Sequence, residues 1–529
     1  MIDATTRPDE GAIGVSGSAH LAEEAGQAFI VEALADGSAL GSGQPLKRID
    51  THMSRLFLGR DRVFKLLRSR RHPFADMSSI EARRQACEAE LAVNAIMAGD
   101  LYERVSPVIR DADGAIRIQG EVSGEGEILD WVVIMHRFAD GALVEEIAED
   151  GGLTPDLVTQ IADVVASFHG ALPPEALGGH AADYERIIQG LRRTEAQGAA
   201  ALGLEADSEA LFGGLERELT RAAPLIEVRR KAGWVRRGHG DLHLRNICLF
   251  KGKVTPFDAL EFDPALATAD VIYDMAFLFM DLRARGLNAY ANLAMNRYWD
   301  ASRQPEEALA LLPLFTALRA AVRMAVAVEA GSLEEAARYR ALGLELLKRA
   351  PGRLVAVGGL SGTGKSTLAQ ALAPDLPGPC GGRLLRSDVI RKALAGVEAT
   401  TRLGGAAYEP ASRASIYREL ALKAREALGA GASVIADGTF REGHARDSIE
   451  GAAAGHPFTG LWLRALIDTR LARVSGRRND ASDATVQVAL AQSEPGNLGA
   501  VWQVIDADPP AAVLAEALRP LMRGPAPRT

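Results

Sequence analysis

The sequence predicts a multidomain protein in which an N-terminal two-lobed α+β domain precedes a C-terminal doubly wound α/β domain with a parallel sheet. Three observations predict this fold class. The chain has 529 residues, which is more than one hydrophobic core normally supports. Short β-like runs surround one helical run up to about residue 138, and mostly helical sequence follows to about residue 351. From there the pattern becomes strand, glycine loop and helix, which is typical of a parallel sheet.

The elements of the small lobe follow one another in a clear order. The β-like runs LFLG and RVFKLL are separated by the turn-like GRD, and the helical run SSIEARRQACEAELAVNAIMAG comes next. SPVIRDADGAIRIQG then carries a DG hairpin signal, and the apolar WVVIMHRF follows it. TPDLVTQIADVVASFHGAL and ADYERIIQGLRRTEAQ begin the helical lobe. The expected bounds are 1–40 for a loosely ordered segment with a short helix, 41–350 for the first domain (small lobe 41–138, helical lobe 139–350) and 352–529 for the second, with the boundary at Pro351 and Gly352.

Composition limits the classes of protein to which the chain can belong. Hydrophobic residues at 47% and charged residues at 24% are ordinary for soluble proteins, and we expect neither a membrane span nor a secretory signal. A net charge of -9 makes nucleic acid an unlikely partner. Cys87, Cys248 and Cys380 lack a zinc-binding spacing, so we expect inert buried thiols and a cytoplasmic location. The oligomeric state stays open.

GLSGTGKS, from Gly359 to Ser366, fits the phosphate-binding pattern G-x-x-x-x-G-K-[ST] completely. It lies between the apolar run LVAVGG and the helical run STLAQALA, which is the context that the pattern requires. We expect Lys365 to neutralise the β- and γ-phosphates of ATP and Ser366 to bind Mg²⁺. The predicted phosphate-binding residues are Gly359, Ser361, Gly362, Thr363, Gly364, Lys365, Ser366 and Thr367. The alternative is a glycine turn that only packs the strand against the helix.

Two acids follow apolar runs in the same domain. Asp388 in RLLRSDVIRKALAG can polarise an acceptor hydroxyl or order magnesium-bound water, while Arg391 screens negative charge one turn later. Asp437 in SVIADGTF ends the next run and is a candidate magnesium or substrate contact. The alternative for each acid is a helix N-cap, and for Asp388 also a plain surface acid.

These motifs resemble the P-loop kinases of the gluconate kinase, polynucleotide kinase and zeta-toxin group. The resemblance covers most of residues 352–510 and implies that Asp388 of the D-x-x-R element is the catalytic acid. RLARVSGRRNDASDA, which contains Arg470 and Arg473, resembles the arginine-bearing lid of that group. Arg477 or Arg478 is then expected to stabilise charge on the transferred phosphoryl group; a solvated basic helix face is the alternative.

HGDLHLRN, from His239 to Asn246, has the form H-x-D-x-x-x-x-N of a kinase catalytic loop. VTPFDALEFD then supplies Asp258 twelve residues after Asn246. At this point the chain resembles the aminoglycoside phosphotransferase and choline kinase group, over about residues 45–345. The resemblance implies a bilobal protein-kinase-like fold with Asp241 as the catalytic acid, Asn246 and Asp258 as metal ligands, and Asp274 in support.

The same resemblance assigns a phosphate-binding lysine to the small lobe. Lys65 in RVFKLL is expected to bind ATP phosphates and to pair with Glu90, with Glu88 as the alternate; solvent-facing side chains are the alternative for both. IMHRF would be the hinge beside adenine. No G-x-G-x-x-G precedes Lys65, although Ser54 or backbone amides near Thr51 could replace it. The histidines His169, His239 and His243 are expected to be structural.

Taken over nearly its whole length, the chain resembles bacterial fusions of an aminoglycoside phosphotransferase-like domain with a P-loop kinase-like, AAA-family ATPase domain. The leading expectation is a bifunctional kinase that uses ATP and Mg²⁺ to phosphorylate hydroxyl groups of small molecules. One alternative makes the first domain a regulatory, metabolite-sensing module. Another makes the second domain a polynucleotide 5′-hydroxyl kinase, which the overall acidity disfavours.

Overall fold

The structure is a computed structural model that describes residues 26–51, 53–71, 76–121, 125–202, 205–261, 264–476 and 481–523, with the side chains of residues 197–202, 205, 264–265, 405–406 and 523 left out. Its contacts form two compact units: unit 1 is Met1–Leu153 with Arg237–Thr268, and unit 2 is Thr154–Arg236 with Ala269–Thr529. The division passes through the short paired strands β7 (Val235–Arg237) and β10 (Thr268–Asp270). Because the units are groupings of contacts, the domain bounds given above stay a prediction.

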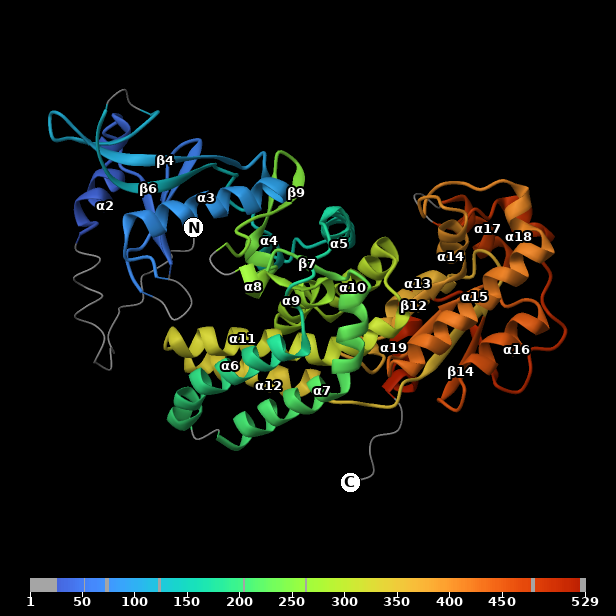
Figure 1. Ribbon diagram of the computed structural model, residues 1–529. Coiled ribbons are helices and arrows are strands. Elements are labelled where there is room, and N and C mark those ends of the chain that lie inside the picture. Colours follow the sequence, from blue (N-terminus) through green and yellow to red (C-terminus); the bar gives the residue numbers. More distant parts are fainter. Residues whose placement is uncertain are drawn as a thin grey trace. The chain divides into compact units, whose positions relative to one another are not determined.

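Unit 1 is built on a six-stranded antiparallel sheet with the order β1-β2-β3-β6-β4-β5. Its strands are β1 (Lys47–Asp50), β2 (Ser54–Leu58), β3 (Arg62–Leu67), β4 (Tyr102–Asp111), β5 (Ile116–Ile118) and β6 (Gly126–His136). Its helices before the catalytic-loop motif are α2 (Ala28–Ala35), η1 (Ser38–Leu40), α3 (Ile80–Ala98) and α4 (Val144–Glu149). Figure 1 shows α3 lying along the sheet beside β4 and β6.

Both faces of this sheet are covered, and that decides where Lys65 points. Phe64 and Leu66 of β3 join the core beneath α2, whereas Val63 and Leu67 join the core that contains α3 residues. Because side chains alternate along a strand, Lys65 shares the α3 face with Val63 and Leu67. The α3 helix starts at Ile80 because the Ser79 side chain accepts a hydrogen bond from the Ala82 amide. The strand lysine is thereby placed under a capped helix.

The second segment of unit 1 is short and compact. It contains η2 (Leu244–Asn246), the hairpin strands β8 (Ile247–Phe250) and β9 (Lys253–Pro256), and α8 (Pro264–Ala267). Gly240 has φ +82°, and a Cβ there would lie 2.8 Å from Leu260 Cβ, so the turn inside HGDLHLRN requires glycine. The motif therefore forms a loop that leads directly into a buried hairpin.

The first part of unit 2 is helical, as the sequence predicts. Its helices are α5 (Pro155–Ala171), α6 (Ala181–Leu202), α7 (Glu205–Lys231), α9 (Val271–Ala284), α10 (Asn288–Ser302), η3 (Glu306–Leu311), α11 (Leu312–Glu329) and α12 (Leu333–Leu346). Among the described residues one helical stretch, Glu306–Glu329, is apolar and long enough to cross a membrane, with a mean hydropathy of 1.7. Its apolar window is 72% buried inside the fold, where α11 packs on α12, α9 and α6. It is the core helix of this layer.

The remainder of unit 2 is a five-stranded parallel sheet with the order β12-β13-β11-β14-β15. The strands are β11 (Leu354–Gly359), β12 (Arg383–Arg386), β13 (Val434–Asp437), β14 (Phe458–Arg464) and β15 (Trp502–Asp506). The helices are α13 (Lys365–Leu372), η4 (Ala373–Asp375), α14 (Ser387–Leu394), η5 (Gly405–Tyr408), α15 (Pro410–Gly429), α16 (Gly443–Ala452), α17 (Ile467–Ser475), α18 (Val486–Ala491) and α19 (Ala511–Arg523). Helices α13 and α19 pack together over one core, and α15 and α16 form another pair (Figure 1). The predicted doubly wound domain is confirmed.

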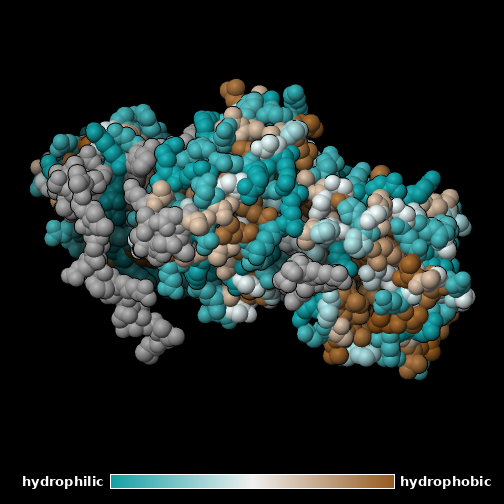
Figure 2. All heavy atoms as spheres, turned by 90° about the horizontal axis from the view of Figure 1, so that it is seen from below, coloured by the Kyte–Doolittle hydropathy of each residue, from teal (hydrophilic) through white to brown (hydrophobic). Residues whose placement is uncertain are grey.

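The three cysteines of the chain are inert because they are buried. Cys87, Cys248 and Cys380 are free and buried, and burial raises the pKa of Cys248 and of Cys380 to about 12. Figure 2 shows apolar residues gathered on the right-hand part of the view, over the parallel-sheet domain. Exposed apolar side chains of that domain include Leu394, Leu422, Leu466, Leu490, Val501, Val504 and Val513.

Candidate active sites

Lys65 is the centre of a charge cluster in unit 1, in which Lys65 and Glu90 are buried and the Asp258 side chain is 43% exposed. Its Nζ lies 2.8 Å from Glu90 Oε1 and 2.7 Å from Asp258 Oδ1. Burial alone would lower the pKa of Lys65, but the carboxylates of Asp258 and Glu90 raise it well above its ordinary value. Glu88, the alternate partner, is instead exposed and pairs with Arg84 at 2.7 Å. The structure therefore pairs Lys65 with Glu90, and the lysine remains charged.

The cluster contains more acidic groups than basic ones. Burial and the nearby Glu90 carboxylate raise the pKa of Glu261 to about 8, and burial also raises the pKa of Glu90. Glu90 Oε2 is buried and accepts no hydrogen bond among the residues that the structure describes. Tyr102 connects the parts, because its hydroxyl donates to Glu90 Oε1 at 3.3 Å and accepts the Asp258 N–H at 3.2 Å. One lysine thus faces three carboxyl groups.

Asp241 and Asn246 meet within the loop that follows β7. Asn246 Nδ2 donates to Asp241 Oδ2 at 2.9 Å and to the Asp241 carbonyl at 3.0 Å. The Asp241 N–H donates to His239 Nδ1 at 3.3 Å, and His239 Nε2 lies 2.9 Å from the Phe257 carbonyl. Since Nδ1 accepts, Nε2 carries the proton and donates. The buried His239 therefore connects the loop, by hydrogen bonds, to the segment that carries Asp258.

His243 and His169, the two other histidines expected to be structural, also have polar partners. His243 Nε2 lies 3.3 Å from Asp241 Oδ2. In unit 2, His169 Nδ1 lies 2.8 Å from the Tyr298 hydroxyl and Nε2 lies 3.1 Å from Asp274 Oδ2. Asp274 of α9, the predicted supporting acid, thus contacts a histidine of α5 that also contacts Tyr298 of α10.

The predicted metal ligands of unit 1, Asn246 and Asp258, carry oxygen atoms of the kind that bind a divalent cation, although the described residues contain no group of three or more His, Cys, Asp or Glu side chains arranged for a metal. Because Asn246 Nδ2 donates to Asp241, the oxygen Oδ1 is the atom that Asn246 can offer to a metal. Asp258 has φ +61°, a conformation that sets its carboxylate on a turn directly after the buried β9 strand. The surplus of carboxyl groups and the orphaned Glu90 oxygen would both be relieved by added positive charge. Oxygen ligands of this kind suit Mg²⁺.

No glycine-rich turn precedes Lys65, and the β1–β2 connection has another construction. Thr51 Oγ1 accepts the Ser54 N–H at 3.0 Å, and the two hydroxyls lie 3.0 Å apart. Ser54 is buried, whereas Thr51 is exposed. This polar turn stands where the sequence predicts a replacement of the glycine loop.

The phosphate-binding motif of unit 2 forms the loop that its sequence requires. Gly359, Gly362 and Gly364 have φ of +140°, +86° and +91°. A Cβ on Gly362 would lie 2.4 Å from the Arg470 carbonyl oxygen, so a side chain there has no room. Helix α13 begins at Lys365 directly after the loop, which directs its N-terminal amides to the place where phosphates bind. Ser361 and Thr363 are buried within the loop, and Thr367 is exposed on the first turn of the helix.

Three predicted residues gather at the carboxyl ends of β11 and β13. Lys365 Nζ donates to the Leu360 carbonyl at 3.0 Å, and Ser366 Oγ donates to Asp437 Oδ2 at 2.5 Å. The register places Asp437 beside Val357 of β11, four residues before Ser361, and beside Arg386 of β12. A hydroxyl and a carboxylate in contact at a helix N-terminus provide oxygen ligands that suit Mg²⁺.

Asp388 lies in the first turn of α14, two residues beyond β12. Burial and the Asp437 carboxylate raise the pKa of Asp388, whereas Arg391, whose Nε is 3.8 Å from Asp388 Oδ1, opposes the rise. The Arg391 guanidinium lies 4.6 Å from the centre of the Tyr408 ring and donates to the Ala407 carbonyl at 2.7 Å. The acid and its arginine are thus adjacent at the same sheet edge as Asp437.

The arginines of α17 hold the phosphate-binding loop by its carbonyls. Arg470 Nε donates to the Ser361 carbonyl at 2.9 Å, and Arg473 Nη1 donates to Thr363 O at 3.3 Å and to Ala507 O at 2.8 Å. Arg477 and Arg478, the predicted lid arginines, lie outside the described residues, so their role stays a prediction.

Sequence reasoning missed several residues of these sites. Glu261 stands in the quoted VTPFDALEFD, but no spacing rule assigned it. Lys392 Nζ contacts Asp483 Oδ2 at 2.5 Å, and the Tyr408 hydroxyl donates to the same oxygen. Gln492 accepts the Ser361 N–H at 2.7 Å. A signal exists only for Glu261, as an acid near a predicted metal ligand; the other contacts join distant segments.

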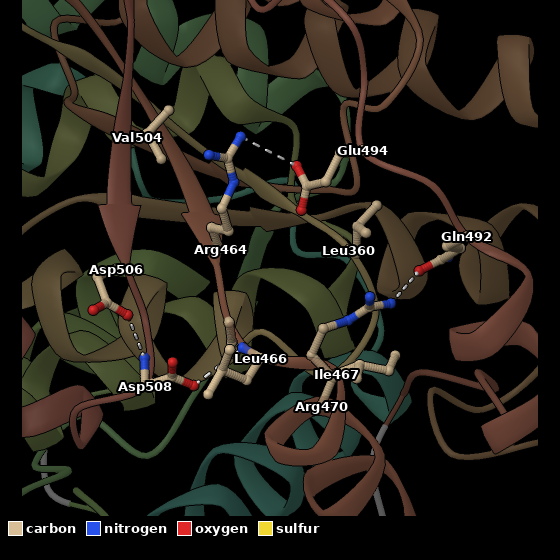
Figure 3. A pocket seen from close by; sticks show the side chains of 11 residues that line it. Leu360, Arg464, Leu466, Ile467, Arg470, Gln492, Glu494, Val504, Asp506 and Asp508 are labelled. Atoms are coloured by element: carbon tan, nitrogen blue, oxygen red, sulfur yellow. Dashed lines mark hydrogen bonds and ion pairs between the residues drawn. The ribbon is translucent and has the colours of Figure 1, made fainter.

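A cavity of about 650 Å³ lies beside the phosphate-binding loop (Figure 3). It is lined by Leu360, Arg464, Ala465, Leu466, Ile467, Arg470, Gln492, Glu494, Val504, Asp506 and Asp508. Arg464 faces Glu494 at 3.8 Å across it, and Arg470 donates to Gln492 Oε1 at 3.4 Å. Lys365, Ser366 and Asp388 are not among its lining residues, so the cavity is separate from the phosphate-binding groups.

Comparison with known proteins supports the assignment of the C-terminal domain. Residues 354–495 match the family model described as an AAA domain. The chain is also 29% identical over 463 residues to uncharacterized proteins of Mycobacterium tuberculosis and Mycobacterium bovis, with 84% of this chain and 88% of each relative covered. The match therefore extends over most of both chains and is not confined to one domain of this chain.

Several solved structures of kinases are similar to a portion of the chain. A choline/ethanolamine kinase family protein from Mesorhizobium loti covers 60% of this chain and 99% of its own, with 15% identity and a TM-score of 0.35. A sugar kinase from Janibacter sp. covers 33% of this chain and 97% of its own, with 25% identity and a TM-score of 0.27. The family match and the parallel sheet with its phosphate-binding loop identify the C-terminal part of the chain as a P-loop domain of the AAA type.

Proposed function

We propose that the chain is a bifunctional cytoplasmic kinase with two ATP sites, each of which transfers the γ-phosphate to a hydroxyl group of a small molecule. The proposal rests on one observation: unit 1 and unit 2 each contain a separate set of residues suited to phosphoryl transfer. Unit 1 places Lys65, Glu90 and Asp258 in one ion cluster, and unit 2 independently places Ser366 against Asp437 beside a complete phosphate-binding loop. Each set offers groups for the phosphates or for their magnesium ion, and each unit also carries an acid proposed to act on the acceptor, Asp241 in unit 1 and Asp388 in unit 2.

In the N-terminal site, Lys65 binds the α- and β-phosphates while Glu90 holds its ammonium group in place. Asp241 accepts the proton of the acceptor hydroxyl as the acceptor oxygen bonds to the γ-phosphorus, and ADP leaves. Asn246 and Asp258 would hold magnesium, which neutralises phosphate charge when bound. Asn246 also orients Asp241, because its Nδ2 donates to the Asp241 carboxylate.

In the C-terminal site, the amides of Gly362 to Ser366 surround the phosphates and Lys365 neutralises their charge. Its present bond to the Leu360 carbonyl must be exchanged for a bond to phosphate. Asp388 accepts the acceptor proton, and Ser366 and Asp437 would hold magnesium. Arg391 lies where it can contact an anionic part of the acceptor, since it is next to Asp388.

The test follows γ-labelled phosphate from ATP into a fractionated metabolite extract. We expect Asp241→Asn and Lys365→Ala each to remove a different labelled product, by about a hundredfold or more. Asp447→Asn, which changes an exposed acid on α16, is the matched control and should keep both products. If no product depends on Asp241, the N-terminal half of the proposal is wrong.

One observation favours a second candidate, in which unit 1 senses a metabolite and regulates the P-loop domain. Lys65 already bridges Glu90 and Asp258, so the proposed phosphate cation is bound to a proposed metal ligand. Nucleotide binding must separate this pair. Under this candidate, Lys365→Ala removes all labelling and Asp241→Asn changes only its rate or its half-saturation.

A further inference from the structure

An asparagine pair on α10 closes the free edge of the parallel sheet. Strand β12 pairs only with β13 among the described strands, so one side of its backbone has no strand partner. On that side, the Leu384 N–H donates to Asn296 Oδ1 at 2.7 Å. The Gly382 carbonyl accepts from Asn292 Nδ2 at 2.9 Å and from Asn296 Nδ2 at 3.1 Å. Asn292 and Asn296 are one helical turn apart, so they present both amides to the strand.

The first residue of β12 is fixed by buried charges from the same region. Arg383 Nε and Nη2 lie 2.9 Å and 3.2 Å from the two carboxylate oxygens of Glu306. Its Nη2 also donates to Asp300 Oδ1 at 2.6 Å. Glu306 is fully buried and the Arg383 side chain is only 4% exposed, so this is a paired charge in the interior. Such a contact strongly restricts geometry.

Helix α10 is itself held from its other side. Arg297 binds Asp163 of α5 through two contacts of 2.5 Å and 2.9 Å. The Tyr298 hydroxyl lies 2.8 Å from His169, which also belongs to α5. The helix therefore stands between α5 and the parallel sheet as a fixed support.

Helix α10 supports β12, the strand that leads to Asp388, the proposed acid of the C-terminal site. β12 ends at Arg386, and Asp388 follows in the first turn of α14. We infer that α10 positions β12, and through it Asp388, so that Asn292, Asn296 and the Arg383–Glu306 pair are positioning residues of the C-terminal active site. This inference rests on the proposed function for its effect on turnover. Under this inference, the P-loop domain needs helices of the helical lobe for full activity.

The test uses the full-length chain with Asn296→Ala, and Asn288→Ala as the matched control. Asn288 is an exposed asparagine at the start of the same helix. Hydrogen exchange of the peptide that covers residues 383–388 measures the strand directly, and hydrolysis of Mg-ATP measures turnover. The C-terminal contribution is the turnover that Lys365→Ala removes.

We expect Asn296→Ala to speed exchange across β12 and to lower the C-terminal turnover number by about tenfold or more, because small misplacements of a reacting group are costly. The KM for ATP should stay within about twofold, since the phosphate-binding loop lies on β11 and not on β12. Asn296→Asp keeps an oxygen for the Leu384 N–H and should recover much of the loss. Unchanged exchange in Asn296→Ala, or an equal change in Asn288→Ala, overturns the inference.

The two proposals fail in distinguishable ways. If Lys365→Ala removes no turnover, the C-terminal part of the proposed function is wrong, and exchange across residues 383–388 still decides whether α10 holds the strand. If Asn296→Ala raises KM and lowers turnover together, the asparagine supports the whole domain rather than Asp388, and the inference is wrong.

Discussion

At the scale of single residues, the cluster around Lys65 shows how burial forces charges to pair. A lysine and three carboxyl groups that lie close together in a largely buried region cannot all be charged without cost, because burial disfavours an ion and like charges repel. Lys65 keeps its charge through Glu90 and Asp258, so the cost falls on the remaining acids. The raised pKa of Glu261, about 8, is the result.

This leads to a pH dependence of stability. The pKa of Glu261 lies above the ordinary value of about 4.3, so the folded chain holds a proton that the unfolded chain releases. Its contribution to the free energy of unfolding is complete below about pH 4 and is lost as the pH rises through about 8. Glu261→Gln removes this dependence. We expect calorimetry between about pH 5.5 and 8.5 to show a flatter unfolding temperature for unit 1 in Glu261→Gln.

The control for this pH experiment is Glu127→Gln, which changes an exposed acid paired with Arg110 at 3.3 Å. It should unfold with the pH dependence of the wild type. An unfolding temperature of Glu261→Gln that falls with pH as steeply as that of the wild type would show that another group carries the proton.

Asp437 allows a test of magnesium binding. Asp437→Asn removes a carboxylate charge from the Ser366 hydroxyl while keeping an oxygen in place. We expect the magnesium concentration for half-maximal C-terminal turnover to rise by about tenfold, as for loss of a ligand or its orienting partner. Titration with MgCl₂ at saturating ATP measures it, with Asp447→Asn as control. An unchanged half-saturation would remove Asp437 from the metal site.

Residue-scale prediction from the sequence succeeds where a local pattern determines position. The alternation of β3 and the helical spacing of α3 place Lys65 and Glu90 on facing surfaces, and Glu88 points elsewhere. The degree of burial of a side chain cannot be predicted in this way, because it depends on which distant segments of the chain cover the residue. Asp258 and Tyr102 lie 156 positions apart in the chain and meet only in the fold. The pKa of Glu261 was therefore beyond sequence reasoning.

At the scale of elements, the phosphate-binding loop depends on glycine for space. At Gly362 a Cβ would meet the Arg470 carbonyl at 2.4 Å, and φ is +86°. Gly362→Ala must therefore move the loop or α17. We expect the Kd for ATP at this site to rise by about tenfold or more, measured by calorimetric titration in the Lys65→Ala background, which removes the proposed phosphate-binding lysine of the N-terminal site.

Gly451→Ala is the matched control for the loop. Gly451 lies in α16, and a Cβ added there would meet nothing within 4 Å among the described residues outside its own helix backbone. Alanine favours a helix over glycine, so this variant should bind ATP normally and be equally or more stable. Normal ATP affinity in Gly362→Ala would show that the loop tolerates a side chain.

Element-scale prediction followed the same rule of local pattern. Strand, glycine loop and helix appear at the predicted place, because all three depend on consecutive residues. The edge contact between Asn296 and Leu384 joins positions 88 residues apart, and no periodicity marks it. Asn292 and Asn296 look like ordinary polar positions of a helix until β12 is in view.

At the scale of the whole molecule, the sequence pattern predicted an α+β part and helices followed by a parallel α/β part, in the order that the structure has. It did not predict the contacts that connect the helices of unit 2 with the parallel sheet. Contacts group the helical layer with the parallel sheet, and a buried ion pair links them. Glu306 serves Arg383 and also lies 3.3 Å from Lys423. A boundary placed at a proline and a glycine marks a change of pattern along the chain, and contacts can still cross it.

Because the Glu306–Arg383 ion pair connects the helical layer with the parallel sheet, we expect the two to unfold together. Glu306→Leu leaves the Arg383 charge buried with a weakened set of partners, which should cost about 3 kcal/mol or more. Glu306→Leu combined with Arg383→Met removes both charges and should recover most of that loss. Arg519→Ala, which breaks partly exposed pairs with Asp375 and Glu516 at the surface, is the control and should change stability by less than about 1 kcal/mol. Hydrogen exchange under mild denaturant measures α11 and β11 peptides separately. If both accelerate equally in Glu306→Leu, unit 2 is one cooperative body; if only β11 accelerates, the parallel sheet unfolds independently of the helices and the ion pair does not couple them.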